Sequence, residues 1–217
     1  MADHFAEFSM PDTDLTRKAY DHAFALGPAP LAHHGVRVYL FGRAIGETRG
    51  VRPGRDYDDE LLFLSSVLHD IGLTAPGDGD QRFEVDGADA AAEFLSANGL
   101  DGERAGAVWE AIALHTSLGI AHRMRPETAL THAGSAADVV GLGAEVLAAD
   151  LTARAHAAFP RLDAGCGLTE IMVDQIARNP AKAPMGSLPA EIARQDGADV
   201  RTPEWSALVA AAWPGVD

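Results

Sequence analysis

The segment Leu61–Leu73, LLFLSSVLHDIGL, constrains the fold of this chain more than any other stretch. Its apolar residues recur with the helical period, so the pattern predicts a buried helix from about Asp58 to Leu73. His69 and Asp70 nevertheless stand side by side near its end. An uncompensated buried carboxylate is costly. Asp70 must therefore be paired, hydrogen-bonded or bound to a metal, unless it turns out to solvent at the helix end.

The rest of the sequence predicts further helices and little that alternates like a strand. Hydrophobic residues make up 47% of the chain and aromatic residues only 6%, so alanine and leucine dominate a sizeable core. Glycine and proline separate the helical segments. The expected helices span about 13–26, 31–47, 58–73, 85–97, 102–117, 126–141, 143–159 and 168–178. The prediction is an all-α protein.

A chain of 217 residues is near the upper end of one ordinary domain. No stretch looks like a linker between two cores. We expect a single domain over residues 1–217, with its core at about 13–160. Five prolines after residue 179 predict that residues 161–217 form C-terminal helices and a wrapping tail.

Charge and composition limit the partners that the protein can have. A net charge of −15 disfavours nucleic acid, because phosphate binding needs clustered lysine and arginine, and it suits a small neutral substrate. No apolar run approaches the roughly 20 residues that span a bilayer, and the amino-terminal residues do not resemble a secretory signal. Cys166, the only cysteine, fits a reducing cytoplasm and is expected to be incidental. The alanine-rich helices near both ends leave a homo-oligomer open.

Ionisable residues also occur on other predicted apolar helices. The stretch AHHGVR contains His33 and His34, IALHTS ends a helix with His115, and SAADVVG contains Asp138. A divalent metal bound by histidine and aspartate needs three or four protein ligands, which facing helices of a bundle can supply. Each residue alone is explained as a core or surface polar group. Together, the order His, His-Asp, Asp indicates a metal site between helices.

This ordered set resembles the HD-domain metallohydrolase superfamily and, within it, the cyanamide hydratase-like branch. The resemblance covers about residues 31–162 and also rests on RFEVDGADAAAEFL and PETALTHAGSAADVVG. It implies an all-α HD-domain bundle with four metal ligands, which fall on His34, His69, Asp70 and Asp138. His34 is preferred over His33 because members typically place an arginine three residues after the ligand, and Arg37 fits. Arg37 itself is expected to form an ion pair or to support a ligand.

The resemblance also implies an activity. One divalent metal ion, zinc or alternatively iron(II), manganese or nickel, would activate a water molecule that adds to a small nitrile-type substrate, with cyanamide giving urea. Asp70 would be catalytic as well as a ligand, and His115 would bind substrate or relay a proton. Glu84 and Thr116 are expected to line the pocket. For these two residues a solvated surface position stays open.

Three alternatives remain. The first is a phosphohydrolase acting on a nucleotide or another small phosphomonoester, which needs cations at the mouth of the site. Candidates for those cations are Arg82, Arg123 and Arg125, which otherwise are exposed charges near loops. A di-iron oxygenase of the same fold needs a further histidine, but residues 71–110 contain none, so Glu84 or Asp86 would have to replace it. A non-catalytic binding module is the third, although all four ligand positions are occupied.

Overall fold

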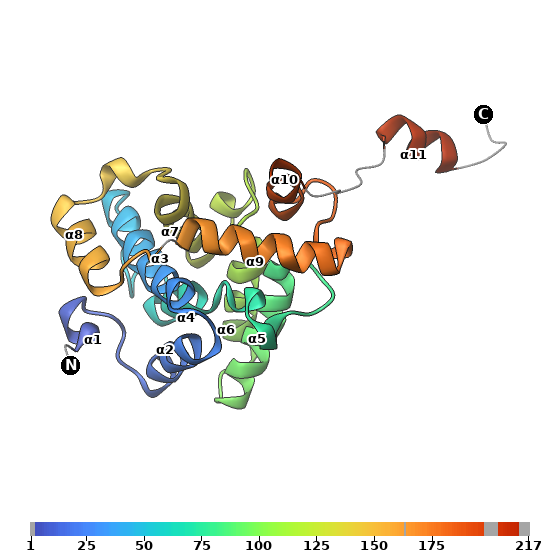
Figure 1. Cartoon of the computed structure of the whole chain (residues 1–217). Helices are drawn as coiled ribbons and strands as arrows, with labels where there is room; N and C mark the ends of the chain where they lie inside the picture. The colour runs from blue at the N-terminus through green and yellow to red at the C-terminus, as the bar shows by residue number, and fades with distance from the viewer. Residues whose placement is uncertain (1–2, 163, 198–203, 213–217) are drawn as a thin grey trace.

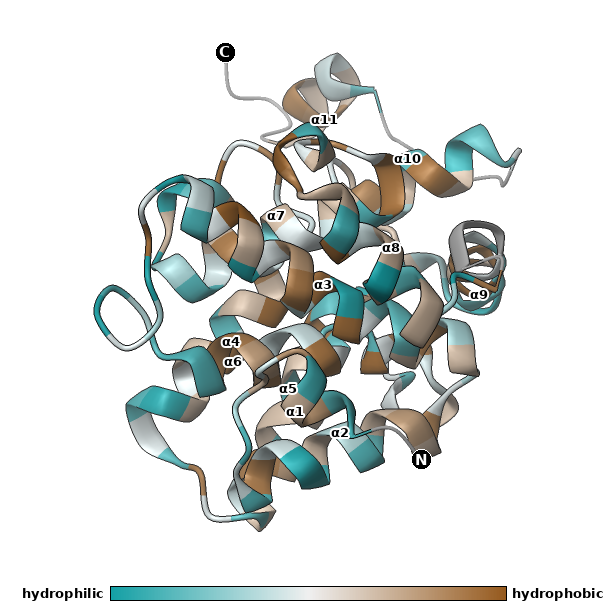
Figure 2. Cartoon of the chain, turned by 90° about the vertical axis from the view of Figure 1, so that its left-hand side faces the viewer, coloured by the Kyte–Doolittle hydropathy of each residue, from teal (hydrophilic) through white to brown (hydrophobic). Residues whose placement is uncertain are grey.

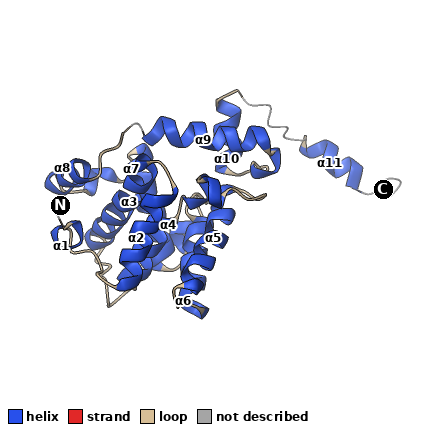
Figure 3. Cartoon of the chain, turned by 60° about the horizontal axis from the view of Figure 1, so that its bottom comes forward, coloured by secondary structure: helices blue, strands red, loops and turns tan. Residues whose placement is uncertain are grey.

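The computed structural model describes residues 3–162, 164–197 and 204–212. These residues form helices joined by short loops (Figure 3), and among them there is no strand, only an isolated bridge between Pro53 and Tyr57. The predicted all-α class is confirmed. The α-helices are α1 (His4–Glu7), α2 (Asp14–Leu26), α3 (Ala29–Thr48), α4 (Asp59–Leu68), α5 (Phe83–Ala97), α6 (Gly102–Leu114), α7 (Pro126–Val140), α8 (Ala149–Ala158), α9 (Ala164–Arg178), α10 (Leu188–Gln195) and α11 (Trp205–Ala212). The 3₁₀ turns are η1 (Ile71–Leu73), η2 (Ala75–Gly77), η3 (Ala121–Arg123), η4 (Ala144–Val146) and η5 (Pro180–Lys182).

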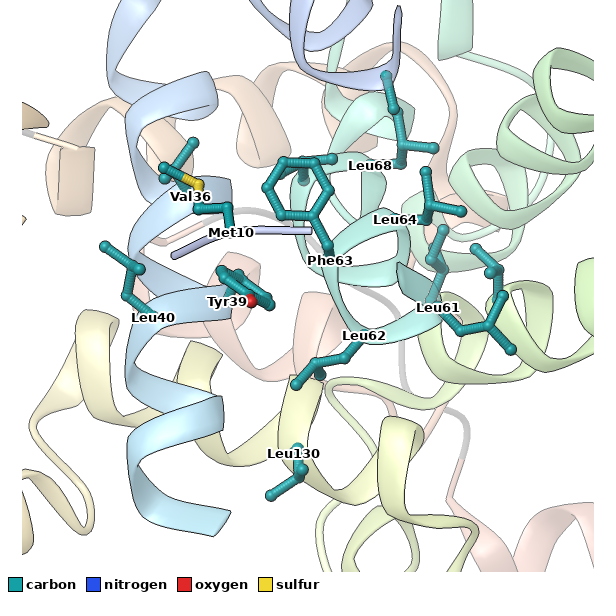
Figure 4. Packing of buried hydrophobic residues seen from close by; sticks show 14 of the residues in the cluster. Met10, Val36, Tyr39, Leu40, Leu61, Leu62, Phe63, Leu64, Leu68 and Leu130 are labelled. Carbon is teal, nitrogen blue, oxygen red and sulfur yellow. The ribbon is translucent and has the colours of Figure 1, made fainter. Parts of the chain in front are cut away.

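The main core lies between α3, α4, α6 and α7 (Figure 1). Helix α4 is buried on every side, since all residues from Leu61 to Leu68 are buried. The side chains of Tyr39 and Phe63 face each other across α3 and α4, with their ring centroids 5.1 Å apart (Figure 4). A helix that is apolar all round must be central to its bundle, and α4 holds that place.

Two glycines allow α3 and α7 to pack closely. A Cβ atom at Gly134 would lie 2.1 Å from the backbone oxygen of Val38, and one at Gly42 would lie 2.5 Å from that of Leu130. Such distances leave no room for a side chain on either helix. Because α3 carries His34 and α7 carries Asp138, this close approach also brings those two residues together.

Replacing Gly134 by alanine should therefore destabilise the protein by about 3 kcal/mol, the upper end of what overpacking costs. The matched change Gly106→Ala, at an exposed position of α6 with open space around it, should instead stabilise by up to about 1 kcal/mol, because alanine is the better helix former. Denaturant unfolding of both variants measures the difference. Equal midpoints would contradict the role assigned to Gly134.

The predicted helix from Asp58 to Leu73 is wrong at its end, because α4 stops at Leu68. His69 bonds through Nδ1 to the carbonyl oxygen of Ser66 at 2.7 Å, next to where a continuing helix would place the amide of Asp70. Asp70 adopts φ −105° and ψ 10° instead and begins the turn η1. The local hydrogen bond of His69 thus ends the helix.

The predicted helix over residues 143–159 is wrong at its start, because α8 begins only at Ala149. Gly141 and Gly143 both have positive φ, η4 follows, and Leu147 is extended at φ −77° and ψ 136° before α8 begins. Leu147 packs against the main core, so tertiary contact prevails over the helical preference of this alanine-rich stretch. Helix α9 starts at Ala164 rather than at residue 168. The side chain of Cys166 lies outside the described residues.

The C-terminal helices α9 and α10 belong to a second hydrophobic cluster. It joins Met172 and Ile176 of α9 to Leu31, Leu73 and Phe83, which lie at the start of α3, in η1 and at the start of α5. Helix α11 lies apart from this cluster and exposes apolar residues (Figures 1 and 2). Among the described residues, no helix is both long and apolar enough to cross a membrane.

Candidate metal centre

His34, His69, Asp70 and His115 converge at a buried point between three helices. His34 comes from the first half of α3, His69 and Asp70 follow α4, and His115 follows α6. Their exposed fractions are 1%, 1%, 7% and 4%. The Nε2 atoms of His34 and His69 are 3.2 Å apart, and Oδ2 of Asp70 lies 3.1 Å from His69 Nε2 and 3.6 Å from His34 Nε2. Nε2 of His115 is 3.6 Å from Oδ1 of Asp70.

Each of the three imidazoles is held by a hydrogen bond at Nδ1. The acceptors, all at 2.7 Å, are the carbonyl oxygen of Ser66 for His69, the carbonyl oxygen of Ile112 for His115, and the carboxylate of Asp138 for His34. A carbonyl or carboxylate oxygen can only accept, so Nδ1 carries the proton in each ring. The three rings therefore direct Nε2 at the centre, in the manner of metal-ligating histidines whose other nitrogen is tied down.

Local sequence explains how these rings are placed. His69 and His115 both occupy the position just after a helix, where the side chain reaches back to the carbonyl oxygen three residues earlier. His34 is brought to His69 by its neighbour Gly35, at which a Cβ atom would lie 3.0 Å from the backbone oxygen of Ser66. Glycine at this position thus allows α3 and α4 to approach closely.

The electrostatics of the centre favour positive charge beside Asp70. Burial would raise the pKa of Asp70, yet the charge and hydrogen bond of His69 hold that pKa well below its usual range. Burial likewise would lower the pKa of His69, but Asp70 outweighs it and the pKa of His69 is raised. Burial lowers the pKa of His115 to about 4, so that this ring is neutral at pH 7. Asp70 is thus an ionised carboxylate that requires a cation.

The residues present fit a divalent metal ion. Ligand atoms about 2.0–2.1 Å from a tetrahedral ion are roughly 3.4 Å from one another, which agrees with the 3.1–3.6 Å separations within His34, His69 and Asp70. Among the described residues, these three form one group able to hold an ion. Two imidazole nitrogens, each free of a proton at Nε2 when the ion binds, and one ionised oxygen are donors that zinc and related metals accept.

Asp138 lies on the far side of the His34 ring from this group. It is 3% exposed, and its carboxylate accepts two hydrogen bonds from Arg37, from Nε and from the terminal nitrogen, both at 2.7 Å. Arg37 is fully buried, and the ion pair expected of it is confirmed. Although burial would raise it, the pKa of Asp138 is lowered by His34 and Arg37. The structure thus shows Asp138 orienting His34, and its service as a fourth ligand stays a prediction.

Glu84 and Thr116 meet beside His115. Glu84 is completely buried, so the solvated alternative for this residue is wrong, and the half-buried Thr116 donates a hydrogen bond to its carboxylate. Arg82 adds a forked pair, with Nε 3.0 Å from Oε2 and a terminal nitrogen 2.5 Å from Oε1 of Glu84. The ring of Phe83 is 5.6 Å from that of His115. A buried polar pair and one aromatic wall therefore stand next to the centre.

Sequence reasoning missed contacts from distant segments. Nδ1 of His132 bonds to the carbonyl oxygen of His115 at 2.6 Å, and Nε2 of Gln175 donates to the carbonyl oxygen of Gly72 at 2.9 Å. Lys182, 2% exposed, ties the C-terminal segment to α5 and the loop before it. Its acceptors are Asp86 at 2.5 Å, Gly79 at 2.8 Å and Asp78 at 2.9 Å. No local sequence pattern predicts these contacts, because the two partners of each lie far apart in the sequence or on different helices.

Comparison with known proteins agrees with this centre. Residues 31–142, just over half of the chain, match the HD domain. The chain belongs to the HD domain family. It is also 28% identical over 158 residues to cyanamide hydratase DDI2 and to cyanamide hydratase DDI3 of Saccharomyces cerevisiae, which covers 70% of this chain and 68% of each relative.

Membership of this family makes the protein one of the HD-domain metal-dependent hydrolases. The matched segment contains His34, the His69–Asp70 pair and Asp138 in the order expected from the sequence. Helix α9, which packs against the turn after Asp70, and helix α10, which packs against α9, lie beyond it.

Proposed function

We propose that this HD-domain protein is a metal-dependent hydratase that adds water to a small nitrile-type substrate, converting cyanamide to urea. The observation that carries the proposal is the buried convergence of Nε2 of His34, Nε2 of His69 and Oδ2 of Asp70, with His115 beside them. The similarity to two cyanamide hydratases supports the choice of substrate.

His34, His69 and Asp70 would hold one divalent ion, most simply zinc, and Asp138 is proposed as a fourth ligand. When bound, such an ion supplies a Lewis acid that lowers the pKa of water from 15.7 toward 7. Iron(II), manganese and nickel suit the same donors. The forked pair of Arg37 with Asp138 and the hydrogen bond that Nδ1 of His34 donates to Asp138 would keep that ring oriented toward the ion.

His115 is proposed to contact the substrate. Its Nδ1–H is held by the carbonyl oxygen of Ile112, so Nε2, 3.6 Å from Asp70, offers a lone pair. That nitrogen can accept a hydrogen bond from the amino group of cyanamide and can relay the proton that its nitrile nitrogen needs. Glu84 and Thr116 would form the polar wall next to it, and Phe83 the apolar wall.

Two of the three arginines expected at a phosphate site are already paired. Arg82 forms its forked pair with Glu84, and Nε of Arg125 lies 3.2 Å from Glu110. Nε of Arg123 donates to the ring of His122. Paired guanidinium groups do not present a free fork to a phosphate, so these contacts favour a small neutral substrate over a phosphomonoester.

We also propose that the protein is cytoplasmic, that it binds neither nucleic acid nor a membrane, and that it forms a homo-oligomer.

A second metal ion would need further ligands. Asp86, one of the two carboxylates considered for it, is paired with Lys182 at 2.5 Å, and Glu84 is paired with Arg82 and Thr116. Both carboxylates are thus compensated by protein groups. We therefore propose one ion per chain rather than a di-iron oxygenase or a metal-free binding module.

Purified protein loaded with one equivalent of zinc should produce urea from cyanamide. Treatment with a chelator should abolish the activity and added zinc should restore it. Asp70→Ala should be inactive and should bind no metal, whereas His115→Ala should keep the ion and lose roughly 100-fold or more in kcat, the range for a general acid or base. Urea formation that persists both after chelation and in the Asp70→Ala variant would contradict the proposal.

A further inference from the structure

Leu31, in the first turn of α3, is a wall shared by two cavities. One cavity, of about 10 Å³, is lined by His69 and Asp70 together with residues of α2, α3 and the turn after α4. The other, of about 200 Å³, is also lined by Leu31 and lies between the start of α3 and the first half of α9. Its lining consists of Pro28, Pro30, Leu162, Gly167, Leu168, Glu170 and Ile171.

The two cavities differ in volume and therefore in the size of molecule that each can hold. About 10 Å³ is the space for the centre of one water molecule, so a nitrile does not fit in this cavity unless a wall side chain moves. The 200 Å³ cavity is large enough for a small organic molecule. Since Leu31 borders both, movement of its side chain would join them.

Leu31 is in contact with α9 on one side and close to Gly27. It is 7% exposed and packs in the second hydrophobic cluster with Met172 and Ile176 of α9. Gly27 stands just outside it, and a Cβ atom there would lie 3.1 Å from Cδ2 of Leu31 and 3.1 Å from Cγ2 of Thr74. A side chain at position 27 would therefore press on the methyl group of Leu31, and glycine avoids that contact.

We propose that Leu31 is a gate between this larger cavity, the vestibule, and the metal centre, and that its size limits which nitriles reach His69 and Asp70. The proposal rests on the hydration reaction proposed above for its substrate class. One wall of the vestibule comes from α9, which lies beyond the residues that match the HD domain.

The first test compares two leucine-to-alanine variants of the zinc-loaded protein. Leu31 and Leu73 belong to the same buried cluster, but Leu73 lines neither cavity. For Leu31→Ala, the ratio of kcat/KM for dimethylcyanamide to kcat/KM for cyanamide should rise at least about tenfold, as expected when a pocket wall is shortened. Leu73→Ala should leave the ratio within about twofold. Equal ratios in the two variants would overturn the gate.

A second measurement does not depend on the reaction. The rate at which dipicolinate removes zinc from the loaded protein should be faster in Leu31→Ala than in Leu73→Ala, because the chelator must reach the same centre. Gly27→Ala, which crowds Leu31, should slow the removal. If the wild-type protein hydrates no nitrile, the proposed function fails while these rates still test the gate. Removal rates that are the same in all variants would show that Leu31 does not control access.

Discussion

Replacing His34 by alanine should release the metal and abolish turnover, whereas the same change at the adjacent His33 should preserve both. Nε2 of His34 faces His69 and Asp70 at 3.2 and 3.6 Å, so its loss removes a donor from the centre. His33 points elsewhere, because its Nδ1 bonds to the carbonyl oxygen of Pro160 at 3.0 Å. Affinity for zinc should fall by more than the roughly 10–100-fold typical of losing an outer partner of a ligand.

The two variants are compared by their metal content, from elemental analysis, and by their zinc affinity, from competition with an indicator. The His33→Ala protein serves as the matched control, since it has lost an imidazole from the next position of the same helix. A His34→Ala protein that keeps one ion with wild-type affinity would show that the centre is not a metal site. Loss of metal from His33→Ala instead would reverse the assignment of the two histidines.

Replacing Arg37 by alanine should destabilise the fold by about 3–5 kcal/mol, the cost of breaking a buried ion pair from one side. Arg37 is fully buried and donates three of its hydrogen bonds at 2.7 Å, two to Asp138 and one to the carbonyl oxygen of Phe159. Without it, the buried carboxylate of Asp138 loses its only fully buried cationic partner among the described residues. His34 and the more exposed Arg161 would then have to compensate that charge.

Denaturant unfolding of the metal-free protein at constant pH measures this cost, with Arg154→Ala as the control. Arg154 is also an arginine on a helix, but its side chain is 46% exposed and it pairs with the exposed Asp150 at 3.0 Å. Exposed pairs contribute little, so the control should lose about 1 kcal/mol or less. Equal losses in the two variants would mean that the Arg37–Asp138 pair is not needed for stability.

Much of the helical arrangement follows from local patterns. Thr13 and Asp58 cap α2 and α4, Pro126 occupies the first turn of α7, and Gly141 ends α7 with φ 74°. Residues of these types mark the starts and ends of helices in proteins generally. The errors occur where a tertiary contact or a side chain competes with propensity. His69 ends α4 by bonding to Ser66, and Leu147 leaves the helical conformation to pack on the core.

The sequence by itself determined which groups need a cation. An aspartate and histidines on apolar helices carry a desolvation cost that is the same wherever the helices lie, so the pattern indicated His69 and Asp70. The choice of His34 over His33 came from the resemblance to the HD-domain superfamily. Only the tertiary structure decided what each group contacts. Four features were visible only in the tertiary structure. They are the orientation of Nε2 of His34 toward the centre, the forked pair of Arg37 with Asp138, the burial of Glu84 and the contact of Leu31 with two cavities. Most of these features arise from helices distant in sequence, whose approach depends on packing that no local pattern encodes.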